Sequence, residues 1–348
     1  MMEKLRADSG SNVELIAEVG QAHEGSLGMA HAYIDALADT GVDTVKWQIH
    51  IAEAESSPEE PFRVKFSKQD ATRMDYWRRM EFTMDQWREI KSHCESVGVQ
   101  FLASPFSQAA VDLLEEIGVS RYKIGSGEVL NFLMLEKIGR IGKPVLLSSG
   151  MSSLEELDEA VHFIQKHNNP LSLFQCTTAY PTAPSQYGTN VIGILKERYS
   201  GIPIGFSDHS GDIYAGLMAA TLGAELLEFH VVFDKKMFGP DVRASLTIPQ
   251  VKQLVEGVRA IEIALSHPID KTDNSAFAGL KSIFEKSLAV SRDLPAGHVL
   301  QLEDLEAKKP ARMGIPAHNF ERVIGRKLNT SKAKFSFLKE GDVEEGVS

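Results

Sequence analysis

Charged and polar side chains recur where short apolar runs of this chain end. Lys46 and Gln48 close the run at residues 44–48, Lys123 follows Tyr122, and His230 follows Phe229. A charge at the end of a buried strand is unfavourable unless it is paired or binds a ligand. A series of such charges is typical of one active site. The sequence therefore predicts a catalytic rim built from several strand ends.

Two histidines are candidate ligands of a divalent cation. His209 and His230 come at the ends of the last two predicted strands, and acidic residues, Asp208, Glu228 and Asp241, lie near them in the sequence. Imidazole and carboxylate groups suit several divalent metals. The alternative is that each histidine is only a hydrogen-bonded rim residue, and the residue pattern alone leaves both interpretations open.

Two lysines occur inside apolar runs, where an unpaired ammonium is unfavourable. Lys46 and Lys123 are candidates for clamps on a phosphate or carboxylate, for structural ion pairs with Glu18 or Glu128, or for a Schiff-base lysine. We expect the anion clamp.

Small-residue turns that contain serine follow three of the predicted strands. They carry Ser104, Ser126 and Ser148, at residues 103–105, 124–128 and 148–151. Such turns expose backbone N–H groups to an anion, especially when a helix begins soon after. Each turn is a weak signal alone, but three on one rim favour phosphate binding.

Two further residues have alternative roles. Glu18 is either a general base, a group that positions water, or the counter-charge of Lys46. Tyr180, in the segment CTTAYPT, is either a wall of the substrate site or ordinary packing.

The elements that must position these residues alternate along the chain. From about residue 13 to 270, apolar runs typical of strands alternate with amphipathic stretches typical of helices. Eight strands are predicted, at residues 13–19, 44–49, 100–103, 121–124, 144–148, 171–176, 203–207 and 226–231. We therefore predict an α/β fold, a TIM (β/α)8 barrel with its site at the carboxyl ends of the strands.

Three other segments complete the predicted organisation. A long loop at about residues 50–85 is expected to form a lid over the site. We predict a barrel domain at residues 1–270, a linker at 271–280 and a small β-rich domain at 281–348.

Composition narrows the class of protein. The net charge of −11 argues against a nucleic-acid or anionic membrane partner, so any phosphate ligand must be bound locally. There are only two cysteines, Cys94 and Cys176, and no membrane-length apolar run or signal-like segment is found. We expect a cytoplasmic location.

These segments resemble the N-acetylneuraminate (sialic acid) synthase family, which includes legionaminate and pseudaminate synthases and spore coat polysaccharide relatives. The motifs that match it in order are AEVGQAHEGS, VKWQ, FLASPFS, YKIGSGE, GKPVLLSSGM, CTTAYPT, IGFSDHS, GPDVRAS and VIGRK. The last segment lies in a part that resembles the antifreeze-like (SAF) domain.

The resemblance implies condensation of phosphoenolpyruvate with the open-chain aldehyde of an N-acylmannosamine-type sugar, with release of phosphate. His209 and His230 would hold Mn²⁺, or another divalent cation such as Mg²⁺ or Co²⁺, and Glu18 would deliver or deprotonate the attacking water. The residues expected to hold phosphoenolpyruvate are Lys46, Lys123, Ser104, Ser126 and Ser148. Those expected on the substrate side are Gln48, Glu128, Tyr180 and Asp241.

The resemblance also implies a domain-swapped homodimer, in which the small domain supplies an arginine to the partner's sugar site. The corresponding position here is Lys309, so we name Arg312 as a possible substitute. The chain departs from the family pattern also at Ala22, Thr178 and Phe229, which we expect, with Lys309, at the sugar-facing edge of the site. We therefore expect an acceptor, an amino sugar or related aldose, that differs from N-acetylmannosamine.

Two other functions stay open at this point. One is a Schiff-base pyruvate aldolase on the same barrel, using Lys46 or Lys123. The other is a degenerate paralogue that binds a sugar or a partner synthase without catalysis.

Overall fold

The structure, a computed structural model, describes residues 13–344. Its contacts divide the chain into two compact units, one before Pro268 and one from Pro268 onward. Each unit is described by itself.

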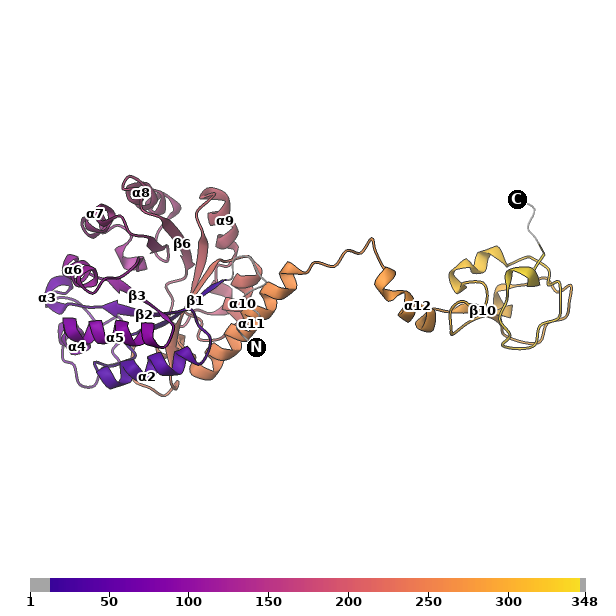
Figure 1. The fold of residues 1–348 in the computed structure, drawn as a ribbon, viewed down its shortest axis with the longest axis horizontal. Helices are drawn as coiled ribbons and strands as arrows, with labels where there is room; N and C mark the ends of the chain where they lie inside the picture. Colours follow the sequence, from indigo (N-terminus) through magenta and orange to yellow (C-terminus); the bar gives the residue numbers. More distant parts are fainter. Residues whose placement is uncertain (1–12, 345–348) are drawn as a thin grey trace. The chain divides into compact units, whose positions relative to one another are not determined.

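The first unit is a parallel barrel surrounded by helices (Figure 1). Its strands are β1 (Glu14–Gly20), β2 (Thr44–Ile49), β3 (Gln100–Pro105), β4 (Tyr122–Ile124), β5 (Val145–Ser148), β6 (Leu171–Cys176), β7 (Ile204–Asp208) and β8 (Leu226–Val232). The helices between and after them are α2 (Leu27–Ala38), α5 (Met84–Ser96), α6 (Gln108–Glu116), α7 (Phe132–Ile141), α8 (Leu154–Gln165), α9 (Asn190–Arg198), α10 (Tyr214–Thr221) and α11 (Ile248–Ser266). All eight predicted strands are present, and the predicted TIM-type barrel is confirmed.

The strands pair in parallel in the order β3-β2-β1-β8-β7-β6-β5-β4. In this register Glu18 on β1 lies opposite Lys46 on β2 and opposite His230 on β8. The barrel is nearly closed, since β3 and β4 are in contact although no ladder pair is described between them. A short strand that the sequence did not predict, β9 (Leu246–Thr247), extends the pairing of β8.

Alternation along each strand separates the chemistry from the core. Successive side chains of a strand point to opposite faces of the sheet. On β8, Leu227 and Phe229 belong to the large core between strands and helices, whereas Glu228 and His230 belong to the opposite face. Below the polar side chains the barrel is filled by a separate apolar cluster, Ile16, Leu102, Leu146, Phe174 and Leu226.

Capping residues fix where several helices begin. Ser26 caps α2, and Thr83 and Ser153 form capping boxes at the starts of α5 and α8. Each cap satisfies backbone N–H groups that have no partner within the helix. These three helices therefore begin directly after the Ser or Thr that caps them.

The segment between β2 and α5 contains two helices, α3 (Ala52–Glu55) and α4 (Arg73–Met80). It has a small core of its own, made by Tyr76, Trp77 and Met80 with Phe62 and Phe66 packed against them. We refer to residues 50–83 as the lid segment.

The second unit is a small β-rich fold. An antiparallel pair, β10 (Ser287–Val290) and β11 (Leu305–Lys308), is joined by isolated bridges to the turns that follow. Its core contains Leu288, Val290, Leu300 and Leu338. The helix α12 (Ala278–Phe284) precedes β10, so the predicted linker at 271–280 includes the first residues of a helix.

No helix among residues 13–344 is both long and apolar enough to span a bilayer.

The apolar cluster inside the barrel provides a test of the fold. Leu102 is fully buried there, so Leu102→Ala should lower the free energy of unfolding by about 2–5 kcal/mol. All three tryptophans, Trp47, Trp77 and Trp87, precede Pro268, so urea unfolding followed by tryptophan fluorescence reports on the barrel. Leu133→Ala is the control, because Leu133 is 73% exposed and its truncation should change little. Equal losses for both variants would contradict the assignment.

Candidate active site

A cavity of about 520 Å³ lies where the strands end. Every site residue that the sequence predicted within the barrel lines it: Glu18, Lys46, Gln48, Ser104, Lys123, Ser126, Glu128, Ser148, Tyr180, His209, His230 and Asp241. These residues come from all eight strands or from the loops directly after them. Residues far apart in the chain are thus brought to one site.

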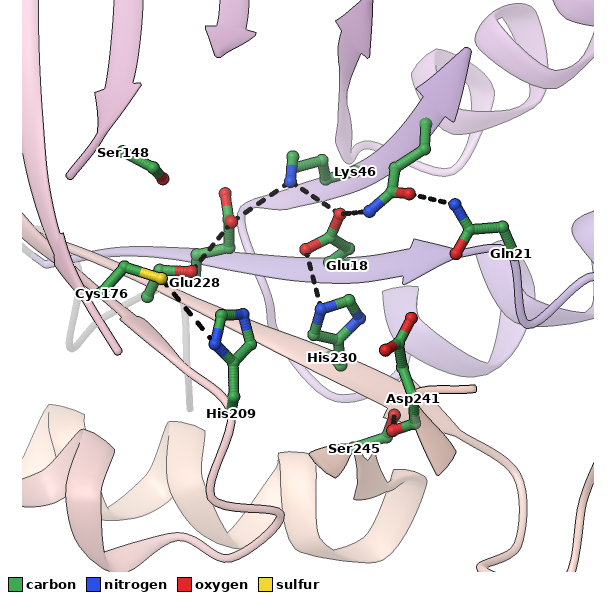
Figure 2. A network of polar contacts seen from close by, with 12 residues as sticks. Glu18, Gln21, Lys46, Ser148, Cys176, His209, Glu228, His230, Asp241 and Ser245 are labelled. Atoms are coloured by element: carbon green, nitrogen blue, oxygen red, sulfur yellow. Dashed lines mark hydrogen bonds and ion pairs between the residues drawn. The ribbon is translucent and has the colours of Figure 1, made fainter. Parts of the chain in front are cut away.

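Four buried charges, Glu18, Lys46, Lys123 and Glu228, form the floor of the cavity, and Figure 2 shows all of them except Lys123. The ammonium of Lys46 lies 2.7 Å from Glu18 Oε1 and 3.2 Å from Glu228 Oε1. Lys123 shares the same Glu228 oxygen at 3.2 Å. The alternative of an ion pair between a lysine and Glu128 is therefore wrong. Glu228 is the partner of Lys123, and Glu128 instead accepts a hydrogen bond from the Asn131 amide.

The two lysines differ in electrostatic environment. Burial works against the charge of Lys46, but Glu18 and Glu228 outweigh it and raise its pKa. Burial dominates for Lys123, whose pKa is lowered although Glu228 attracts its charge. Lys123 is therefore the ammonium whose charge is less well compensated, and a bound anion would stabilise it.

Glu18 is held as a carboxylate. Its Oε1 accepts hydrogen bonds from Lys46 and from Gln48 at 2.6 Å, and its Oε2 lies 3.4 Å from His230 Nε2. Burial opposes the charge, but Lys46 and His230 outweigh it and hold the pKa of Glu18 well below its usual range. A carboxylate of this kind is a weak base, so it is better suited to positioning a water than to removing its proton.

His209 and His230 lie side by side at the cavity wall, with ring centroids 5.3 Å apart (Figure 2). The Nδ1 of His209 lies 3.0 Å from the Thr177 carbonyl oxygen, an arrangement that orients the ring and leaves Nε2 for a ligand. Burial lowers the pKa of His230 and so favours its neutral form. Burial opposes the charge of His209 as well, but Cys176 and the Thr177 carbonyl raise its pKa to about 9, so a metal would displace a proton there.

Within the described part of the chain, no group of three or more His, Cys, Asp or Glu is placed to hold a metal ion. The two imidazoles nevertheless have the chemistry of metal donors, and one is already oriented by a carbonyl. They would supply two protein ligands, and solvent or substrate the others.

The serine turns surround Lys123. Its ammonium donates to Ser148 Oγ at 2.5 Å, and the Gly150 N–H donates to Ser126 Oγ at 3.2 Å. A Cβ on Gly150 would lie 2.5 Å from that Ser126 oxygen, so the turn needs glycine. The hydroxyl of Ser104 is buried and has no hydrogen-bond partner among the described residues. Such a hydroxyl is expected where a bound ligand supplies the partner.

The lid segment completes the outer part of the cavity. His50 is stacked between Trp77 and Phe106, at centroid distances of 3.7 and 4.4 Å, and bonds Glu55 through Nδ1 at 2.6 Å. The predicted lid thus does contribute side chains to the site.

Of the positions that depart from the family pattern, Phe229 lies elsewhere than expected. Thr178 lines the cavity, but Phe229 is buried between strands and helices, so it does not face the sugar side. Ala22 packs against the same core. Lys309 and Arg312 belong to the second unit, where Arg312 lines a separate cavity and the Lys309 ammonium lies 4.9 Å from the centre of the Phe284 ring.

The sequence did not predict that Glu228 is a counter-ion shared by two lysines. It also did not predict four other residues that line the cavity: His50, Arg63, Arg73 and Cys176. The spacing of two between Glu228 and His230 signals that both face the same side. For the lid arginines the sequence has no comparable signal.

Two lysines, two carboxylates and two histidines thus point into the cavity at the carboxyl ends of the strands. In a (β/α)8 barrel this is the face at which enzyme active sites lie. Residues 33–270 match the NeuB family, and residues 285–344 match the SAF domain. The chain belongs to the NeuB family and is a phosphoenolpyruvate-dependent synthase. The match confirms the resemblance seen in its motifs.

Known relatives extend over nearly the whole chain. It is 33% identical to N,N'-diacetyllegionaminic acid synthase of Campylobacter jejuni, over 90% of this chain and 94% of that protein. It is also 33% identical to human N-acetylneuraminate-9-phosphate synthase, over 90% of this chain and 88% of that protein. Among solved structures, the N-acetylneuraminic acid (sialic acid) synthetase of Leptospira borgpetersenii is similar with a TM-score of 0.67 and 28% identity, covering 78% of this chain and 90% of that one.

The lowered pKa of Lys123 predicts how anion binding depends on pH. Free lysine has an ordinary pKa of 10.5, and Lys123 loses its proton at a lower pH. Sulfate, whose charge does not change between about pH 7 and pH 10, should therefore bind more weakly as pH rises, because the neutral amine no longer attracts it. Calorimetric titration at several pH values measures this. In Lys123→Met the alkaline decrease should shrink to the part that comes from His209, whose pKa is raised to about 9, and an unchanged decrease in that variant would contradict the role of Lys123.

Proposed function

We propose that the protein condenses phosphoenolpyruvate with an N-acylmannosamine-like sugar aldehyde to give a nonulosonic acid and phosphate. The observation that carries the proposal is the floor of the cavity, where Lys46 and Lys123 converge on one carboxylate. The buried Ser104 hydroxyl, which has no hydrogen-bond partner among residues 13–344, lines the same cavity. Such a cluster suits a small substrate with both a carboxylate and a phosphate. The names of the relatives, legionaminic and neuraminate synthases, support the same reaction class.

The proposed reaction balances with one water. C3 of phosphoenolpyruvate forms a bond to the aldehyde carbon, whose oxygen becomes a hydroxyl. Water adds at C2, and the C2–O bond to phosphate breaks so that inorganic phosphate leaves. The protein must therefore hold two substrates in line and stabilise positive charge that develops at C2.

The residues of the floor serve these needs. Lys46 and Lys123, with Ser104, Ser126 and Ser148, would bind the carboxylate and phosphate of phosphoenolpyruvate. The permanently ionised Glu18 would orient the attacking water and stabilise charge at C2, which is the role its low pKa suits. Gln48, Tyr180 and Asp241 would contact the sugar, with Glu128 at the edge of the same cavity.

His209 and His230 would hold Mn²⁺ or a similar divalent cation, which when bound polarises a carbonyl oxygen as a Lewis acid. Independently of the metal, Tyr180 packs on His209 with ring centroids 4.3 Å apart and limits access of water to that wall.

The other expectations are part of the proposal. We infer a cytoplasmic enzyme that acts as a domain-swapped homodimer, with Lys309 and Arg312 reaching the sugar side of the partner. The departure of Lys309 from the family pattern makes recognition of an N-acyl group the step that most needs measurement.

One observation favours a second candidate function, a Schiff-base aldolase. The lowered pKa of Lys123 is a property of nucleophilic lysines. The raised pKa of Lys46 makes that residue unsuited to the same role. Trapping of a pyruvate adduct by borohydride would support this second function.

Phosphate release tests the proposed reaction. Purified protein with Mn²⁺ should release phosphate from phosphoenolpyruvate only when an acceptor from a panel of mannosamine derivatives, 6-deoxy-diaminomannose and neutral aldoses is present. Lys46→Met should lower kcat/KM by about a hundredfold or more, because a buried charge-assisted contact is lost. Lys91→Met is the control, since Lys91 pairs with Glu95 on the surface of α5 and does not line the cavity. No release with any acceptor would refute the reaction.

Metal removal gives a separate test. Chelation should abolish phosphate release, and Mn²⁺ should restore it. His209→Ala and His230→Ala should each weaken Mn²⁺ binding, followed by the electron paramagnetic resonance signal of the free ion, by about tenfold or more. His162 lies on α8 and does not line the cavity, so His162→Ala should bind like the parent protein. Full activity in chelator would exclude metal assistance.

A further inference from the structure

We propose that Arg63 of the lid segment is a specificity residue that binds the acceptor sugar and selects an uncharged sugar over a sugar phosphate. The inference rests on the proposed function, because it assigns the acceptor class of the same site. Arg63 stands outside every motif that carried the resemblance, and it lines the cavity together with Arg73.

Arg63 is placed directly on the residues expected to contact the sugar. Its guanidinium carbon lies 4.0 Å from the centre of the Tyr180 ring, and its Nη2 lies 2.5 Å from Asp241 Oδ1. Tyr180 in turn packs on His209. One arginine from the lid segment therefore meets two loops of the barrel beside the candidate metal ligands.

The neighbours of Arg63 in the chain hold it in the lid segment. Phe62 and Phe66 contact each other edge to face at 5.8 Å, and Phe66 packs on Tyr76 at 5.0 Å. Both phenylalanines pack against the small core of the lid segment. The guanidinium is thus presented by a packed element, and its stacking on Tyr180 orients its plane.

The charges around Arg63 argue for an uncharged ligand. Both arginines that line the cavity already face a carboxylate, Arg63 that of Asp241 and Arg73 that of Glu60 at 3.4 Å. A sugar phosphate would have to displace one of these carboxylates or bring its charge beside it, which is unfavourable. Asp241 occupies one nitrogen of Arg63, and its other N–H groups can donate to a hydroxyl or an amide carbonyl without any change of charge.

Binding and turnover of three sugars test the inference. The probes are N-acetylmannosamine, 6-deoxy-diaminomannose and N-acetylmannosamine 6-phosphate, measured by ligand-observed NMR titration and, with phosphoenolpyruvate and Mn²⁺, by phosphate release. The better of the two unphosphorylated sugars should give about a tenfold or higher kcat/KM than the sugar phosphate. Arg63→Ala should raise the KM and dissociation constant of that unphosphorylated sugar about tenfold or more and leave the KM for phosphoenolpyruvate within twofold, and Arg63→Lys should recover only part of the loss.

The control is Arg78→Ala, because Arg78 lies on α4 of the same segment but pairs with Glu53 at the surface. Its kinetic constants should match those of the parent protein, and thermal unfolding should show that all variants are folded. The inference is overturned if the phosphorylated sugar is preferred, if Arg63→Ala leaves acceptor binding unchanged, or if both substrates lose affinity equally. Acceptor binding that depends on Arg63 without phosphate release would instead refute the proposed reaction alone, whereas failure of all three sugars to bind would refute the inference.

Discussion

The sharing of one buried carboxylate by two lysines is the interaction on which the site depends. Removing ammonium and carboxylate groups from water costs several kcal/mol per ion, which attraction repays only in good geometry. The barrel provides this geometry because Glu18, Lys46, Lys123 and Glu228 project from four strands into one space. Such a cluster contributes little to stability compared with apolar filling. Its position in the cavity at the ends of the strands is consistent with the proposed binding of an anionic substrate there.

Local regularity explains why much of this was predictable from the sequence. Some strands show an apolar run interrupted at spacing two by polar residues, as in Lys46 and Gln48 on β2 and Glu228 and His230 on β8, so the inward-facing residues there follow from alternation. The partner of Lys123 was not predictable, since β4 and β8 are not neighbours in the sheet and meet only across the barrel interior. The expectation for Phe229 was wrong because neighbouring residues of a strand point to opposite faces. Phe229 therefore faces away from the side on which the candidate metal ligand His230 lies.

The lid segment marks where sequence reasoning ends. The position of Arg63 depends on how Phe62 and Phe66 pack against Tyr76, and these contacts have no periodic pattern along the chain. In the proposed reaction the strand residues Lys46, Lys123 and Ser148 would bind phosphoenolpyruvate, whereas the lid segment and the loops that carry Tyr180 and Asp241 would shape most of the acceptor side. Differences in acceptor among relatives are then expected to arise in segments of this kind.

A crystal structure of the protein with phosphoenolpyruvate and Mn²⁺ tests the central claim most directly. The account predicts an intact phosphoenolpyruvate with its anionic groups within hydrogen-bond distance of Lys46, Lys123 and Ser104, and the ion on His209 and His230. A pyruvate carbon bonded covalently to Lys123, or phosphoenolpyruvate bound away from both lysines, would contradict it.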